Sequence, residues 1–140
     1  QATADERIPL LLQCPAAVRW VSYEPALGPV DFRAVPMPDG DTLGDGLFSH
    51  KTGTGISWVV VGGESGPGAR PFDLAWARST SDQCALAGVS YFFKQGGAAP
   101  MFDGAPVLLR DRKGDDVAEL LIALGPSSKA LLRREFPRDR

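Results

Sequence analysis

The sequence is poor in the residues that most often build metal centres and hydrolytic sites. It has one histidine, His50, and two cysteines, Cys14 and Cys84, in 140 residues. The cysteines lie far apart and neither belongs to a Cys-x-x-Cys pair, so we expect no zinc or iron–sulfur site made by this chain alone. Both cysteines are expected to be small buried hydrophobes in a reducing, cytoplasmic compartment. The lone histidine also disfavours Ser-His-Asp chemistry at Ser65.

Long apolar runs and an excess of basic residues are missing as well. No run approaches the roughly 18 to 20 apolar residues that span a bilayer, and the polar first residues do not resemble a signal peptide. The net charge is −2, from 15 Lys and Arg against 17 Asp and Glu, so nucleic acid is not favoured as a partner. We expect the basic tail to be a solvated chain end, with a nucleic-acid-binding arm as the alternative. That tail holds Arg133, Arg134, Arg138 and Arg140.

What is present predicts a single α/β domain over residues 1–140, made of parallel β/α units. Strands are expected at 18–23, 57–61 and 89–93, because these runs are rich in β-branched and aromatic residues. The run at 57–61 does not alternate, which is typical of a strand covered on both faces. Helices are expected from a capping box at Thr3, at 74–87 between Asp73 and Gly88, and at about 116–134 with a break at Gly125 and Pro126.

Two segments stand apart from this pattern. Residues 33–55 are rich in Gly, Pro, Asp and Ser and predict a flexible loop insertion. Residues 98–140 are expected to form a C-terminal extension that carries the last helix. The chain does not begin with Met, so we expect it to be a fragment of a longer protein. The loop also holds His50, expected to be solvated, and three aspartates whose spacing fails the EF-hand pattern, Asp39, Asp41 and Asp45.

Polar side chains follow all three predicted strands. The carboxyl ends of parallel strands meet at one edge of a sheet, so we expect these groups to lie close together. Lys94 is expected to pair with Glu24, with Glu64 or with a ligand. The six groups are Ser22, Glu24, Glu64, Ser65, Lys94 and Gln95.

A glycine-rich segment, 62–71, follows the second strand. Its glycines admit positive φ and allow a ligand to approach the backbone, and successive N–H groups can form an anion nest. Arg70 is a candidate clamp for a carboxylate or phosphate. The segment matches neither the Walker loop nor the dinucleotide-binding fingerprint. The alternative is a purely structural turn in which Glu64 and Arg70 form a local ion bridge.

Several motifs occur together in an order that resembles one known family. They are Ser22-Tyr23-Glu24-Pro25, Val61-Gly62-Gly63-Glu64-Ser65-Gly66, Ala69-Arg70-Pro71, Asp82-Gln83-Cys84, Phe92-Phe93-Lys94-Gln95 and Arg134-Glu135-Phe136-Pro137. In this order they resemble the C-terminal half of the phage gene product 37 / gene product 68 family, whose function is unknown. That family looks like a diverged radical-SAM-type partial barrel, so the resemblance implies the C-terminal part of a TIM-like barrel.

The resemblance also implies a [4Fe–4S] cluster and S-adenosylmethionine in the full-length protein, with no cofactor held within this chain alone. The implied partner is a missing N-terminal half, and exposed strand edges make self-association possible. The function this implies is part of a radical-SAM-like enzyme. The alternative is a non-catalytic nucleotide- or anion-binding module or a phage interaction module, and no catalytic residue is assigned. The candidate ligand-binding residues are Glu24, Gly62, Gly63, Glu64, Ser65, Arg70, Lys94 and Gln95.

Overall fold

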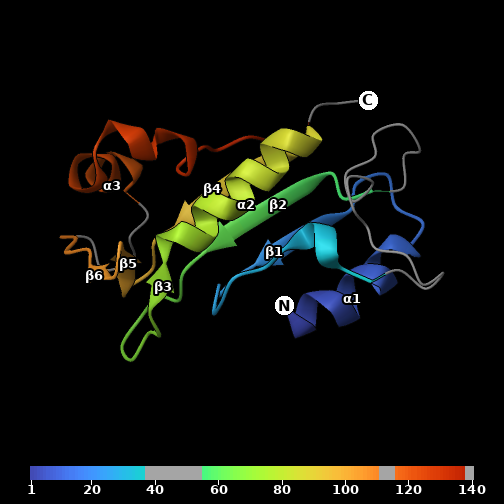
Figure 1. Cartoon of the computed structure of the whole chain (residues 1–140), viewed down its shortest axis with the longest axis horizontal. Helices are drawn as coiled ribbons and strands as arrows, with labels where there is room; N and C mark the ends of the chain where they lie inside the picture. The colour runs from blue at the N-terminus through green and yellow to red at the C-terminus, as the bar shows by residue number, and fades with distance from the viewer. Residues whose placement is uncertain (37–54, 111–115, 138–140) are drawn as a thin grey trace.

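Three parallel strands form the centre of the structure, a computed structural model that describes residues 1–36, 55–110 and 116–137. They are β1 (Trp20–Tyr23), β2 (Trp58–Gly62) and β4 (Ser90–Gln95), in the order β1-β2-β4. The prediction of parallel β/α units is therefore confirmed. The described strands form an open sheet rather than a closed barrel (Figure 1).

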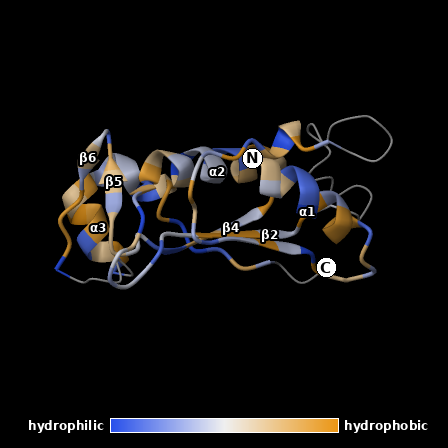
Figure 2. Cartoon of the chain, turned by 90° about the horizontal axis from the view of Figure 1, so that it is seen from below, coloured by the Kyte–Doolittle hydropathy of each residue, from blue (hydrophilic) through white to orange (hydrophobic). Residues whose placement is uncertain are grey.

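One face of this sheet carries the hydrophobic core. In register, Val21 lies beside Val59 and Tyr23 beside Val61. Two helices, α1 (Ala2–Leu12) and α2 (Leu74–Ala87), lie on the same side of the sheet (Figure 2). Val59 and Val61 are fully buried, as expected for a central parallel strand whose side chains meet a helix layer.

The ends of α2 agree with the sequence pattern. The Asp73 carboxylate accepts a hydrogen bond from the N–H of Ala75 (2.9 Å), and Gly88 follows the helix with φ 70°. A side-chain acceptor at the N-cap and a left-handed glycine after the last turn satisfy backbone groups that the helix leaves unpaired.

The start of α1 was predicted wrongly. Thr3 lies inside the helix, and the N-cap is Gln1, which makes no side-chain capping bond. The Gln1 amide instead donates to Asp5 Oδ1 (2.6 Å) and to the carbonyl of Asp31 (3.2 Å). Pro9 is accommodated within the helix.

A second, small sheet escaped the sequence pattern. It contains β3 (Phe72–Asp73), β5 (Pro100–Phe102) and β6 (Ala105–Pro106), with β3 and β5 parallel and β5 and β6 antiparallel. Strands of two or three residues are too short to show a hydrophobic period. This sheet places the segment after Gln95 against the segment after Gly63, which closes the strand ends from one side.

The last predicted helix is two shorter elements. They are α3 (Val117–Leu124) and the 3-10 helix η3 (Pro126–Ala130). Gly125 has φ 81°, which ends α3, and the Asp116 carboxylate caps its first turn through the N–H groups of Ala118 and Glu119. The break at Gly125 and Pro126 was predicted from the sequence, but the length of the helix was not.

The described part of the basic tail is not a solvated chain end. Residues 133–135 run antiparallel to β4, with Phe93 N donating to Arg133 O (2.8 Å) and Glu135 N to Tyr91 O (2.8 Å). Arg133 donates to Ser81 Oγ (3.0 Å) from the adjacent helix. Sequence reasoning missed this because the partners lie about 40 to 50 residues away, and Arg138 and Arg140 lie outside the described residues.

The expectations for the cysteines, for membrane-spanning segments and for the loop 33–55 had different outcomes. Cys84 is buried, but Cys14 is exposed, so only one of the two cysteines is a core residue. Trp20, on β1, is 48% exposed. Within the described residues no helix has the length and apolar character needed to cross a membrane. The predictions for His50, Asp39, Asp41, Asp45 and most of the loop 33–55 concern residues outside the described part.

Candidate functional site at the strand ends

Glu24, directly after β1, is held by side chains from the end of β4. Lys94 Nζ lies 2.8 Å from Glu24 Oε2, and Gln95 Nε2 donates to Glu24 Oε1 (3.3 Å). The Glu24 side chain is 18% exposed and that of Lys94 is 50% exposed. Of the partners expected for Lys94, the structure shows Glu24, and it leaves the cation open to solvent.

Gln95 connects all three strand ends. Its buried side-chain amide also donates to the carbonyl of Gly63 (3.0 Å) and to Ser65 Oγ (3.3 Å). One amide nitrogen therefore bridges the ends of β1 and β2 from its place on β4. Because a buried amide is costly to leave unpaired, these bonds fix the relative positions of Glu24 and Ser65.

Gly63 lies where two backbone segments meet. A Cβ at Gly63 would collide with the carbonyl oxygen of Gly96 and would lie 2.8 Å from a ring carbon of Phe72. Its N–H donates to the carbonyl of Gln95 (3.0 Å). This glycine therefore has a structural role in close packing of the backbone. A structural role and the approach of a ligand are the two alternatives that the sequence leaves open for the segment.

Glu64 and Arg70 form the local ion bridge that the structural alternative predicts. Arg70 donates from Nη2 to Glu64 Oε1 (2.8 Å), and from Nε and its own N–H to Glu64 Oε2 (both 2.9 Å). The Arg70 hydrogen bonds hold the pKa of Glu64 at about 2. With the Arg70 side chain 56% exposed and that of Glu64 31% exposed, the bridge is accessible to a ligand from solvent.

The loop between these two residues projects away from the sheet. Gly66 and Gly68 have φ of 95° and 76°, and a Cβ at either position would meet no atom within 4 Å. The glycines of this segment therefore divide into two kinds. Gly63 packs against Gly96, whereas Gly66 and Gly68 permit a tight, open turn beside Arg70.

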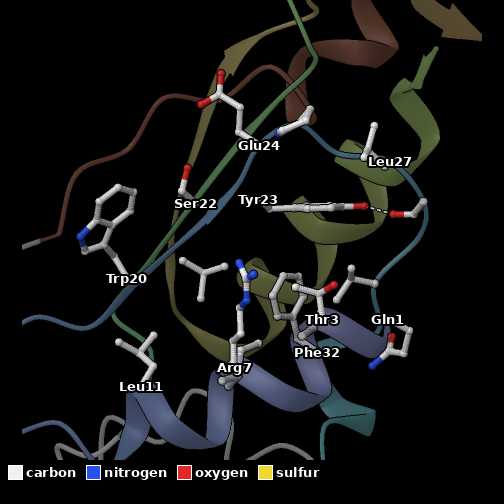
Figure 3. A pocket seen from close by; sticks show the side chains of 16 residues that line it. Gln1, Thr3, Arg7, Leu11, Trp20, Ser22, Tyr23, Glu24, Leu27 and Phe32 are labelled. Atoms are coloured by element: carbon white, nitrogen blue, oxygen red, sulfur yellow. Dashed lines mark hydrogen bonds between the residues drawn. The ribbon is translucent and has the colours of Figure 1, made fainter. Parts of the chain in front are cut away.

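A hollow of about 620 Å³ lies between α1 and β1, and sequence reasoning missed it (Figure 3). Arg7 and Leu11 of α1 line one wall, and Trp20, Ser22 and Tyr23 of β1 line another. Its size falls within the range of small-molecule pockets. No sequence motif could have indicated it, because its walls come from segments that pack together only in the folded chain.

This hollow reaches the strand ends, since Glu24 contributes to its lining. Ser22 lies in its wall and forms no side-chain hydrogen bond with the described residues, so it stands outside the Gln95 network. Tyr23 donates its hydroxyl to the carbonyl of Gly28, and burial raises the pKa of Tyr23 to about 12. The phenol therefore stays neutral and acts as a fixed part of the wall.

The described residues contain no group of three or more His, Cys, Asp or Glu side chains placed to hold a metal ion. Cys84 is also unsuited to ligation, because burial raises the pKa of its thiol to about 12, and a thiol binds metal as the thiolate. What the strand ends offer instead is a set of alternating charges, in which two carboxylates are each paired with a partly exposed cation.

Comparison with known proteins gives one finding. The model of a family described as protein of unknown function (DUF5131) matches residues 1–119. That range contains every candidate residue at the strand ends. No match was found among curated proteins or among solved structures.

Proposed function

We propose that this chain, which belongs to the DUF5131 family of proteins of unknown function, binds a small anionic or zwitterionic molecule at the carboxyl ends of β1, β2 and β4. The observation that carries the proposal is the pair of ion bridges, Glu24–Lys94 and Glu64–Arg70, connected through Gln95 and the end of β2. Ligands of parallel α/β sheets bind at this edge.

The charges of the two bridges suit a ligand that carries both an ammonium and a carboxylate group. The side chains of Lys94 and Arg70 are each at least half exposed. Either cation can therefore donate hydrogen bonds to a ligand carboxylate from the solvent side, without breaking a fully buried ion pair. Glu24 and Glu64 provide acceptors for an ammonium group. The methionyl group of S-adenosylmethionine has this pair of charges, and the resemblance of the motifs supports it as the ligand.

The same resemblance supports a radical-SAM-like enzyme as the context of this site. The residues present here do not fit the iron–sulfur cluster of such an enzyme. Cluster iron is bound by several cysteine thiolates, whereas Cys84 is buried within α2 and no group of ligating side chains surrounds either cysteine in the described ranges. We therefore assign the cluster to another part of a longer protein, which forms the other side of the site.

A non-catalytic anion- or nucleotide-binding module is the second candidate. The open turn at Gly66 and Gly68 beside Arg70 favours it, because positive φ and missing side chains leave backbone N–H groups approachable by a phosphate. Under this alternative Arg70 is the main anchor and Lys94 has little effect on affinity.

Calorimetry on the full-length protein tests both candidates. The ligands are S-adenosylmethionine, methionine and inorganic phosphate, and the variants are Arg70→Ala, Lys94→Ala and Lys129→Ala. Lys129 is an exposed cation on η3 and serves as the matched control. We expect both site variants to weaken binding of S-adenosylmethionine and methionine by about tenfold or more, the size of a charge-assisted hydrogen bond.

The ligand series separates the candidates. Binding of phosphate that depends on Arg70 alone would favour the anion-binding module. Affinities that stay equal across wild type and all three variants would contradict both candidates and leave the strand ends with a structural role only.

A further inference from the structure

One edge of the central sheet is unpaired in the described part of the chain. β4 is bordered by residues 133–135, but β1 pairs only with β2. The carbonyl of Arg19 accepts from Ser57 N (2.7 Å), so it faces β2. Alternate residues of a strand face the same neighbour, and Val21 and Tyr23 therefore face β2 as well. The backbone N–H and C=O groups of Trp20 and Ser22 face the open edge.

The hollow described above lies along this edge. Its lining runs from Arg7, Ile8 and Leu11 of α1 to Trp20 and Ser22 of β1 (Figure 3). The helix α1 thus reaches past the last strand of the sheet, and the space beneath it contains no strand among the described residues. Such an edge is a template for pairing with a further strand.

The arrangement of α2 shows what belongs in that position. α2 connects β2 to β4, packs against both, and lies on the face of the sheet that also carries α1 (Figures 1 and 2). In the strand order β1-β2-β4, β4 follows β2 towards one side of the sheet. A strand at the open edge would precede β1, so the connection from that strand to β1 would run towards the same side. A strand at the open edge that led into α1 would form a second β-α-β unit of the same hand, which is the right hand in nearly all such units.

The hollow also contains an exposed cation that no described residue pairs with. Arg7 rises from α1 into it, and its guanidinium forms no hydrogen bond or ion pair with any described residue (Figure 3). Around it lie Ile8, Leu11 and Phe32, which are apolar. An occupant that fits therefore presents apolar side chains to α1 and one carboxylate to Arg7.

We propose that the open edge of β1 and the hollow under α1 bind a fourth parallel β-strand of the same polypeptide, which leads into α1 at Gln1 and carries an acidic residue opposite Arg7. The position of Gln1 fits this route, because it lines the hollow on the side of the carboxyl end of β1. The inference rests on the proposed function in one respect. The strand would belong to the same part of the polypeptide that forms the other side of the proposed ligand site beside Glu24.

Parallel pairing also distinguishes this strand from a second copy of the chain. A parallel pair is asymmetric, because the two strands use different residues for their hydrogen bonds. Two identical edges related by a twofold axis contact each other through the same residues. A symmetric dimer through β1 would therefore have to be antiparallel, and α1 would not lie over such a pair as α2 lies over β2 and β4.

Amide hydrogen exchange in the full-length protein tests the proposal. With an open edge, the amides of Val21 and Tyr23 exchange slowly and those of Trp20 and Ser22 exchange fast. With a docked strand, all four are slow, and we expect Trp20 and Ser22 to exchange at least about 100-fold more slowly than exposed amides. An alternating pattern would overturn the proposal.

Two substitutions sharpen the test. Proline is tolerated on a strand where its nitrogen faces an open edge, so Ser22→Pro leaves the β2 pairing intact but removes a donor to the added strand. We expect Ser22→Pro to restore fast exchange at Trp20, and Arg7→Ala to speed exchange there while Arg7→Lys does so less. Exchange at Trp20 that neither substitution changes would count against the strand.

Cross-linking of a mixture of nitrogen-14 and nitrogen-15 protein identifies the source of the protection. Cross-links from β1 to a segment of the same isotope only support a strand in the same polypeptide. Mixed-isotope links would overturn the proposal in favour of a second copy. None of these experiments uses S-adenosylmethionine. The proposal of a strand at the β1 edge can therefore be overturned while the proposal of ligand binding is supported, and ligand binding can be overturned while the strand is supported.

Discussion

Glycine at position 63 shows how a single missing side chain positions the strand ends. A Cβ there would collide with the carbonyl oxygen of Gly96 and press on Phe72. Any larger residue at position 63 would therefore push the backbone at Gly63 and the backbone at Gly96 apart. We expect Gly63→Ala to lower the free energy of unfolding by about 1–3 kcal/mol, the usual cost of overpacking. Urea unfolding measures it.

Gly28 provides the matched control for this substitution. A Cβ at Gly28 would meet no atom within 4 Å, and its φ does not lie in the left-handed region. Gly28→Ala is expected to leave stability nearly unchanged. If both variants unfolded at the same urea concentration as wild type, the close approach at Gly63 would not be a real constraint.

The Glu64–Arg70 bridge makes a prediction about pH at the same scale. The hydrogen bonds from Arg70 lower the pKa of Glu64 from 4.5 to about 2. A lowered folded-state pKa means that the bridge stabilises the fold above the unfolded-state pKa and loses this effect as pH falls through about 2. Carbon-13 NMR titration of the Glu64 carboxyl group should show a midpoint near 2.

Arg70→Ala is expected to raise that midpoint towards 4.5, because the donors that favour the carboxylate are gone. Lys94→Ala should leave it unchanged, since Lys94 pairs with Glu24 instead. A midpoint near 4.5 in wild type would show that the bridge is not populated in solution. Because both side chains are partly exposed, we expect high salt to weaken the bridge.

At the scale of the elements, α2 has a side-chain cap at its first turn. Asp73 Oδ1 accepts from Ala75 N at 2.9 Å, at the point where β3 passes into the helix. Asp73→Ala should lower the free energy of unfolding by about 1 kcal/mol. Asp82→Ala, in the exposed middle of the same helix, is the control and should be neutral or slightly stabilising. Equal thermal midpoints for both variants would contradict the role of the cap.

The elements that the sequence predicted well are those with local signals. Asp73 and Gly88 mark both ends of α2, and the apolar run at 57–61 marks β2, because caps and buried strands depend on residues close in the chain. The meeting of Glu24, Glu64 and Lys94 at one edge also followed from parallel topology alone. The pairing within that edge was predicted only as alternatives, the Glu64–Arg70 bridge as one interpretation of the loop and Glu24 as one of three partners for Lys94, because side-chain distances depend on details such as the register shift between Val61 and Gly62.

Features that rest on distant contacts escaped prediction. The hollow beside β1 and the short strands β3, β5 and β6 have no periodic pattern of their own. Arg133 was expected to be solvated because a basic tail usually is. Its hydrogen bonds to Ser81 and Glu135 exist only once residues 133–135 lie along β4.

At the scale of the whole molecule, the C-terminal segment closes the sheet on the β4 side. The indole of Trp58 donates to the carbonyl of Glu135 (2.9 Å), and Ser90 Oγ donates to the carbonyl of Phe136 (3.0 Å). The ring of Phe136 lies 5.7 Å from Trp58 and 5.3 Å from Phe92. This segment therefore covers aromatic residues on the sheet face opposite α2, as well as the β4 edge.

Deleting residues 133–140 should uncover both surfaces. We expect the free energy of unfolding to fall by at least about 2 kcal/mol, because truncation removes the ring contacts of Phe136 with Trp58 and Phe92 and several hydrogen bonds. Trp58 should become more exposed, so its fluorescence should shift to longer wavelength, and the unpaired β4 edge should increase self-association. A deletion of residues 138–140 alone is the control, because it keeps Glu135 and Phe136. Tryptophan fluorescence measures the exposure of Trp58, and light scattering measures self-association. Equal spectra and equal stability for the two deletions would show that residues 133–137 do not stabilise the β4 edge.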